Sequence, residues 1–180
     1  MSDKKTIVID MDEVITDLMP EVIRYYNALY SSDITLEDIT KWDLPKDMRD
    51  LFSVPDLFLD LNPVKGALLG MKKLNRLNCN IIIASDCGGD KNIEIQKMYW
   101  LERYLPFKDM VNVTEISFGG DKGLLTGDVI IDDGLHNLYS FKKTNPNSTL
   151  ICMDKPWNRE FKGLRVFNWD NITELITLIV

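Results

Sequence analysis

Two carboxylates, Asp10 and Asp12, follow directly after the short apolar run Thr6 to Ile9. Such a run predicts a strand that is buried on both faces of a parallel sheet. Ligands of open α/β sheets bind beyond the carboxyl ends of the strands, so both acids are expected to face a cleft. Carboxylate oxygens at that place suit a hard divalent cation. Helix capping is the ordinary alternative for acids after a strand.

Further polar residues follow later apolar runs in the same manner. Ser85 ends one run with a hydroxyl that can bond a phosphoryl oxygen, and Asp132 and Asp133 end another. Between them, Lys122 stands in a glycine-rich loop. Each has a plain alternative as a turn residue, helix cap or surface cation. Their joint presence in this order favours a metal-assisted phosphate site.

The elements that must position these residues alternate along the chain. Apolar runs predict buried strands at 6–9, 80–84, 129–131, 149–153 and 164–167. Apolar residues at helical spacing predict helices after Pro20, after Gly66 and around Ile93 to Leu105. This alternation predicts an α/β sandwich with a mostly parallel central sheet.

The segment 31–63 interrupts that alternation with three prolines and no strong strand pattern. We interpret it as a small helical cap inserted into a core domain formed by residues 1–30 and 64–180. A long packed connection without a role in substrate binding is the alternative. Aromatic side chains of this segment are candidates for contact with a substrate, and these are Trp42, Phe52 and Phe58.

The bulk composition limits the classes of function. With 180 residues, 45% hydrophobic and 27% charged, the chain is expected to form one globular unit. A net charge of −7 argues against binding of polymeric nucleic acid. No signal peptide or membrane span is evident. Three scattered cysteines predict free thiols and a cytoplasmic protein; a homodimer is left open.

The ordered set of Asp10, Asp12, Ser85, Lys122 and the final acidic pair resembles the haloacid dehalogenase superfamily of phosphohydrolases. Within it, the sequence is similar to the 5'(3')-deoxyribonucleotidases. The segments that carry this similarity are the DMD-x-V start, 58–67, 97–104, and Asp-Lys at 121–122 before Ile-Ile-Asp-Asp at 130–133. The resemblance implies a Rossmannoid three-layer sandwich with a small helical cap.

The chemistry expected of this set is hydrolysis of a small phosphate ester, with a nucleoside monophosphate as the substrate. Asp10 would attack phosphorus and form an aspartyl-phosphate, while Asp12 would act as general acid and then general base. Mg²⁺ would be held by Asp10, the Asp12 carbonyl and one or both of Asp132 and Asp133, with Asp133 favoured for direct contact.

Ser85 and Lys122 would hold the phosphoryl oxygens. The resemblance adds Lys97, which aligns with a helix lysine that reaches the phosphate, although a solvated lysine is the alternative. Asp86 belongs to the phosphate site by its position, yet a carboxylate there is unfavourable unless it turns away or meets a cation.

Three residues depart from the family pattern: Glu13 and Gly134, which stand where Gly and Arg are usual, and Asp86. His136 is expected to be a surface or capping residue. Alternatives to a nucleotidase are a phosphate-accepting receiver domain, a non-catalytic nucleotide-binding relative, and a phosphatase of sugar or polyol phosphates. The order of the acids and the lysine argues against the receiver domain.

Overall fold

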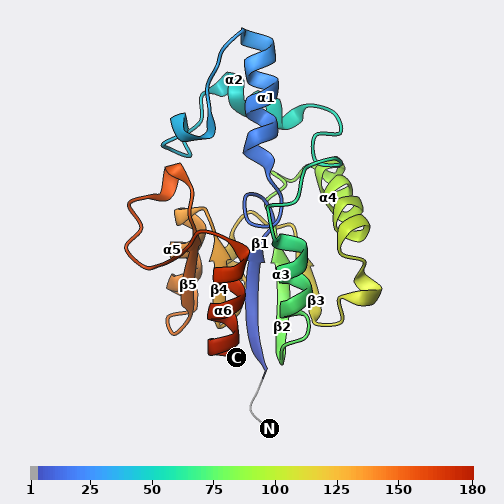
Figure 1. Cartoon of the computed structure of the whole chain (residues 1–180), viewed down its shortest axis with the longest axis vertical. Helices are drawn as coiled ribbons and strands as arrows, with labels where there is room; N and C mark the ends of the chain where they lie inside the picture. Colours follow the sequence, from blue (N-terminus) through green and yellow to red (C-terminus); the bar gives the residue numbers. More distant parts are fainter. Residues whose placement is uncertain (1–3) are drawn as a thin grey trace.

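The centre of the molecule is a six-stranded sheet in the order β3-β2-β1-β4-β5-β6 (Figure 1). The computed structural model describes residues 4–180. Every neighbouring pair of strands is parallel. The strands are β1 (Lys5–Asp10), β2 (Cys79–Ala84), β3 (Val113–Ser117), β4 (Val129–Asp132), β5 (Thr149–Met153) and β6 (Leu164–Val166). The carboxyl ends of all six therefore lie along one edge, and the expected α/β class is confirmed.

Alternate residues of the central strands face opposite sides, each covered by helices. Ile7 and Ile9 belong to the larger hydrophobic core, whereas Val8 belongs to a smaller one. The helices that contribute to the larger core beside the sheet are α3 (Ala67–Leu74), α4 (Lys91–Tyr104) and α6 (Trp169–Ile179). The smaller core is closed by α5 (Leu135–Thr144). This arrangement is the three-layer sandwich that the resemblance implies.

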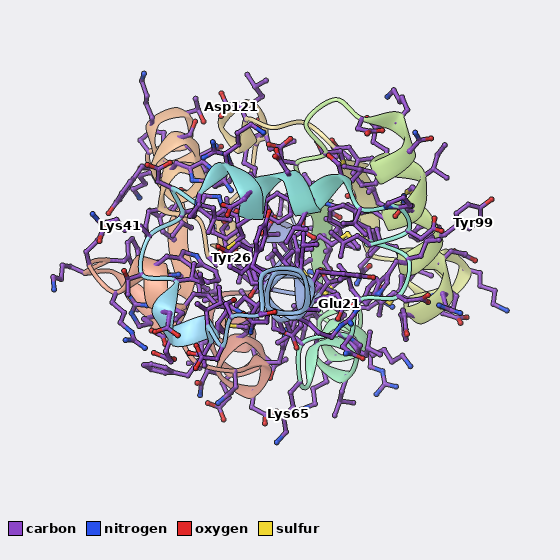
Figure 2. All side chains as sticks on the ribbon, turned by 90° about the horizontal axis from the view of Figure 1, so that it is seen from above. Glu21, Tyr26, Lys41, Lys65, Tyr99 and Asp121 are labelled. Carbon is purple, nitrogen blue, oxygen red and sulfur yellow. The ribbon has the colours of Figure 1, made fainter. Side chains whose placement is uncertain are left out.

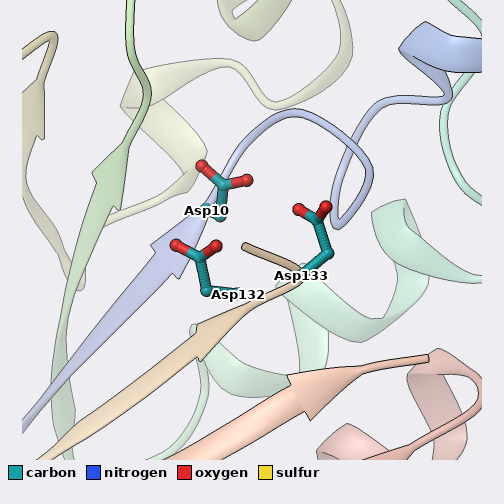
Figure 3. Close-up of side chains that lie close together, drawn as sticks. All are labelled: Asp10, Asp132 and Asp133. Atoms are coloured by element: carbon teal, nitrogen blue, oxygen red, sulfur yellow. The ribbon is translucent and has the colours of Figure 1, made fainter. Parts of the chain in front are cut away.

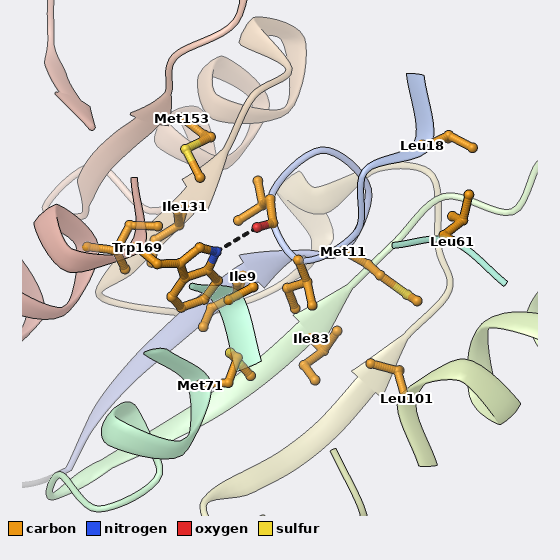
Figure 4. Close-up of a cluster of buried hydrophobic side chains, with 14 of the residues drawn as sticks. Ile9, Met11, Leu18, Leu61, Met71, Ile83, Leu101, Ile131, Met153 and Trp169 are labelled. Carbon is orange, nitrogen blue, oxygen red and sulfur yellow. Dashed lines mark hydrogen bonds between the residues drawn. The ribbon is translucent and has the colours of Figure 1, made fainter. Parts of the chain in front are cut away.

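Trp169 is the largest side chain where α6 meets the sheet, and it is 1% exposed. Its indole N–H donates a 2.8 Å hydrogen bond to the carbonyl of Val14, in the loop that follows β1 (Figure 4). Gly70 of α3 lies against the ring, where an added Cβ would stand 2.2 Å from Trp169 Cε3. The hydrogen bond therefore holds the loop after β1, which contains Asp12, against helix α6.

Strand β3 is not among the strands that the apolar runs predict. Val113 to Ser117 is at the edge of the sheet, and none of its five residues is fully buried. A strand exposed in this way does not need a continuous apolar run, so the pattern used for the inner strands is absent.

Helix α1 (Leu18–Tyr30) rises away from the sheet and lies with the segment that follows it (Figure 1). Residues 31–63 contain only short helices, which are η1 (Leu36–Asp38), α2 (Lys46–Asp50) and η2 (Leu51–Ser53). All three pack against α1. From above, α1 is seen end-on between Lys41 and Tyr99, which lie on opposite sides of the molecule (Figure 2). The division into a core of 1–30 and 64–180 and a cap of 31–63 stays a prediction.

Three further 3-10 helices lie in the connections, namely η3 (Phe107–Asp109), η4 (Lys122–Leu124) and η5 (Pro156–Asn158). Cys79, Cys87 and Cys152 are all buried and free, as expected. Within residues 4–180, every helix falls short of the length and apolar character needed to cross a bilayer.

Candidate active site

Strands β1 and β4 are neighbours, so the acids at their carboxyl ends meet. Asp10 ends β1, Asp132 ends β4, and Asp133 is the next residue. One carboxylate oxygen from each lies within 4.8 Å of the others, and the three side chains converge (Figure 3). Their residues are at most 5% exposed. An all-oxygen cluster of this kind fits a divalent metal ion.

The electrostatics of the cluster also favour a bound cation. Burial raises the pKa of Asp10, and Asp132 and Asp133 raise it further, while Lys122 opposes the rise. Burial raises the pKa of Asp133 to about 7, with the charge of Asp132 as the next cause. Buried carboxylates that repel one another are a favourable setting for a cation, which compensates their charge.

The ammonium of Lys122 provides positive charge within this cluster of carboxylates. Its ammonium donates to Asp10 Oδ1 and, at 2.7 Å, to Asp132 Oδ2. Although burial opposes its charge, the two carboxylates raise the pKa of Lys122. The loop expected to carry it is a short 3-10 helix that begins at Lys122, where the Asp121 side chain accepts from Gly123 N at 2.8 Å.

A second group joins Asp12, Ser85 and Lys97 at the same edge of the sheet. Lys97 Nζ lies 2.5 Å from Asp12 Oδ2, 2.7 Å from Ser85 Oγ and 3.0 Å from the Asp86 carbonyl. Ser85 Oγ also donates to Asp12 Oδ2 at 3.0 Å. Lys97 is only 1% exposed, so the alternative of a solvated helix lysine is wrong.

Asp86 presents its backbone rather than its carboxylate to Lys97. The carboxylate accepts a 2.8 Å hydrogen bond from Gly88 N within its own exposed loop. This turn partly removes the conflict between Asp86 and an anionic substrate, because the carboxylate bonds within its own loop and is exposed to solvent. Asp86 still lines the cavity described next, and its assignment to the phosphate site stays a prediction.

Members of both groups line a cavity of about 330 Å³, but Asp132 and Ser85, each 0% exposed, are not part of its lining. Its polar lining includes Asp10, Asp12, Lys97, Lys122 and Asp133. The aromatic residues expected to contact a substrate line the same cavity, and these are Trp42, Phe52 and Phe58. The structure thus brings the acidic, cationic and aromatic candidates together, although they come from separate parts of the chain.

Two of the aromatic side chains have other contacts as well. The ring of Phe58 lies over Lys97, with 4.7 Å from Nζ to the ring centroid. The ring centroids of Trp42 and Trp157 are 5.1 Å apart, at an interplanar angle of 47°. Phe52, which is partly exposed, has no such aromatic or cationic partner among residues 4–180.

Several residues at the site have no catalytic or binding role in the sequence interpretation. Glu13 lines the cavity but is 1% exposed and paired with Lys155. Trp157 donates to Asp133 Oδ2 at 2.8 Å. His136 is on the exposed surface, as expected, yet it also lines the cavity. Two sequence features indicate such residues: the departure from the family pattern at Glu13 and the aromatic loop after β5.

The family described as "5' nucleotidase, deoxy (Pyrimidine), cytosolic type C protein" matches residues 4–180. A 5'(3')-deoxyribonucleotidase of Bacillus subtilis (strain 168) is 33% identical over 175 residues, covering 94% of this chain and 96% of that protein.

Solved structures share the fold at low identity. A HAD family hydrolase from Deinococcus radiodurans R1, with bound phosphate and sodium, has a TM-score of 0.69 at 11% identity and covers 99% of this chain and 97% of its own. A D,D-heptose 1.7-bisphosphate phosphatase from B. bronchiseptica, complexed with magnesium and phosphate, has a TM-score of 0.58 at 14% identity, with 98% and 99% covered. With a family match over residues 4–180, the chain belongs to the cytosolic type C family of deoxy (pyrimidine) 5' nucleotidases.

Proposed function

We propose that the chain is a phosphomonoesterase that removes phosphate from (deoxy)nucleoside 5'- or 3'-monophosphates through an aspartyl-phosphate on Asp10, with Mg²⁺ as the cofactor. The observation that carries the proposal is the position of Asp10. Its carboxylate lies in the cluster with Asp132 and Asp133, touches Lys122, and lines a cavity with aromatic walls.

Asp10 is the nucleophile because it ends the central strand at the cavity and accepts from Lys122. Attack of its carboxylate oxygen on phosphorus forms the acyl phosphate and releases the alcohol. Lys122 offsets negative charge on the phosphoryl oxygens during both displacements. Lys97, which lines the cavity, and Ser85, which accepts from Lys97 at 2.7 Å, can donate to other phosphoryl oxygens.

Asp12 performs the proton transfers in this proposal. It gives a proton to the leaving oxygen and later takes one from the attacking water. Its carboxylate is held by Ser85 Oγ and by Lys97 Nζ. These two donors limit its rotation and keep it directed into the cavity that it lines.

The residues that would hold Mg²⁺ are Asp10, the Asp12 carbonyl, Asp132 and Asp133. When bound, the ion supplies positive charge that lets a carboxylate approach an anionic phosphate. Asp132 already accepts from Gly134 N at Oδ1 and from Lys122 at Oδ2. Within residues 4–180, Asp133 Oδ1 accepts no hydrogen bond and is the freer oxygen, which favours Asp133 for direct contact.

Recognition of the nucleoside is assigned to the aromatic side of the cavity. Aromatic side chains stack on any base, and each stacked base is worth about 1–3 kcal/mol. Phe52 has the least engaged ring of the three and is the first candidate for this contact. We place the enzyme in the cytoplasm, where such substrates occur and free thiols such as Cys87 stay reduced.

The test is release of phosphate from deoxy- and ribonucleoside 5'- and 3'-monophosphates and from sugar phosphates. Each is assayed with Mg²⁺ and with EDTA, for the wild type and for Asp10→Asn. Metal-dependent release from deoxynucleotides that the substitution abolishes would support the proposal. Release from sugar phosphates alone would keep the mechanism and reject the substrate, and no release from any ester would reject the activity.

A further inference from the structure

The turn that follows β5 holds Asp133 through two successive side chains. Trp157 Nε1 donates to Asp133 Oδ2 at 2.8 Å. Asn158 Nδ2 donates to the Asp133 carbonyl at 2.8 Å and to the Met153 carbonyl at 2.8 Å. The carboxylate and the backbone of the same acid are therefore anchored from one segment, η5, which lies more than twenty residues further along the chain.

This turn is itself rigidly supported. Asn158 is 0% exposed and Trp157 is 5% exposed. Arg165 of β6 donates to Asn158 Oδ1 and to the Asn158 carbonyl, at 2.7 Å each. Such support reduces the rotational freedom of the donors, and a donor with fixed geometry can fix the orientation of the carboxylate that accepts from it.

Trp157 also contacts the aromatic wall of the cavity. Its ring packs on Trp42, which belongs to the segment 31–63 and lines the cavity. Next to this contact, Arg159 and Glu37 form an ion pair of 2.6 Å between the same two segments. The indole of Trp157 thus contacts the cavity wall through its ring and the acid cluster through its N–H.

We propose that Trp157 is a positioning residue that orients the Asp133 carboxylate for the divalent cation and couples cation binding to Trp42. Its N–H occupies Oδ2 of a carboxylate that belongs to the cluster with Asp10 and Asp132, and among residues 4–180 no hydrogen bond reaches Oδ1. The inference rests on the proposed function, since it takes Asp133 as a ligand of the cation. Loss of a partner that orients a metal ligand typically weakens metal binding about 10- to 100-fold.

A purely structural role for Trp157 makes a different prediction, and the chain offers a matched control. Trp100 is also buried, and its Nε1 also donates a 2.8 Å hydrogen bond, to the Leu61 carbonyl. Phenylalanine at either position removes an indole N–H and keeps an aromatic ring. If Trp157 served only for packing, the Trp157→Phe and Trp100→Phe variants would bind Mg²⁺ with the same affinity.

The experiment is calorimetric titration of the full chain with MgCl₂ for the wild type, Trp157→Phe and Trp100→Phe, with urea unfolding of each. We expect Mg²⁺ affinity to fall about 10-fold or more in Trp157→Phe and to stay at the wild-type value in Trp100→Phe. Equal affinity in all three would overturn the inference while leaving the proposed function intact. Absence of Mg²⁺ binding in the wild type would overturn the cation site itself.

The coupling is tested at Trp42, which is 38% exposed and tolerates substitution more readily than a core position. Trp42→Leu removes the ring contact and leaves the N–H of Trp157 in place. We expect it to weaken Mg²⁺ binding in the wild-type background but not in Trp157→Phe. An equal loss in both backgrounds would show that Trp42 acts independently of Trp157 and would overturn the coupling. If Trp157→Phe proved too unstable for titration, Trp42→Leu alone would decide the coupling, because wild-type Mg²⁺ affinity in that variant would overturn it.

Discussion

Lys155 and Glu13 form an ion pair at the wall of the cavity, with 2.6 Å between Lys155 Nζ and Glu13 Oε2. Glu13 has a positive φ of 62°, an unfavourable backbone conformation for a residue other than glycine. Its other oxygen accepts from Met19 N in the first turn of α1. The pair therefore connects the loop after β1 with α1 and with the loop after β5.

Lys155→Met should destabilise the protein by about 3–5 kcal/mol, because it leaves the Glu13 carboxylate buried without its cation. Glu13→Gln with Lys155→Met should cost much less, since neither charge remains. Urea unfolding of both single variants and the double variant measures this difference. Additive single effects in that cycle would show that the two side chains do not interact.

The same pair predicts a pH dependence with a definite sign. Burial raises the pKa of Glu13, and Lys155 opposes the rise. In Lys155→Met the folded protein therefore holds the Glu13 proton more tightly than the unfolded chain does. Stability falls with rising pH wherever the folded state binds more protons than the unfolded chain. The variant should therefore lose stability as pH rises above the ordinary glutamate pKa of about 4.3. A deficit that does not grow between pH 4 and pH 7 would contradict this account.

Lys97→Met should lower kcat by about 100-fold or more, the usual size of a general acid–base contribution. The substitution removes the ammonium that holds Asp12 and Ser85. Lys91→Met is the control, because Lys91 is on the same helix but its side chain is 81% exposed and pairs with Glu94. Steady-state kinetics on a deoxynucleotide, with circular dichroism for folding, would separate the two; a similar kcat for both variants would remove Lys97 from the site.

Phe52→Ala should raise KM for deoxynucleotides roughly 5- to 150-fold, which corresponds to the loss of one stacked base. It should leave KM for glycerol phosphate unchanged, since that ester has no base to stack. Phe167→Ala serves as the control because Phe167 is 67% exposed and outside the cavity lining. An equal rise in KM for both esters would mean that Phe52 shapes the cavity without contacting a base.

Gly70→Ala should lower stability even though alanine favours a helix. A Cβ at this position would stand 2.2 Å from Trp169 Cε3, and the ring is 1% exposed. Overpacking of a core costs up to about 3 kcal/mol, which exceeds the helix gain of about 1 kcal/mol. At Gly119 the nearest atom to an added Cβ is 3.9 Å away, so Gly119→Ala should be nearly neutral. Thermal unfolding midpoints of the two variants provide the comparison.

Much of the framework was predictable from local patterns. The apolar runs before Asp10, Ser85 and Asp132 are strands of the inner sheet, because inner parallel strands are buried on both faces. Polar residues directly after such runs must emerge at the carboxyl edge of the sheet. The edge strand β3 lacks this constraint and was not predicted for that reason.

The sequence alone therefore determined the kind of fold, the acids at its carboxyl edge and the family. Only the tertiary structure decided which residues share the site. Lys97 is buried because α4 places it against Asp12. Glu13 and Lys155 lie 142 positions apart, and the sequence carries no local sign that they pair. Trp157 contacts Asp133 because β4 and β5 are neighbours in the sheet. Contacts between distant residues depend on strand order and on helix packing, and neither leaves a periodic trace in the sequence.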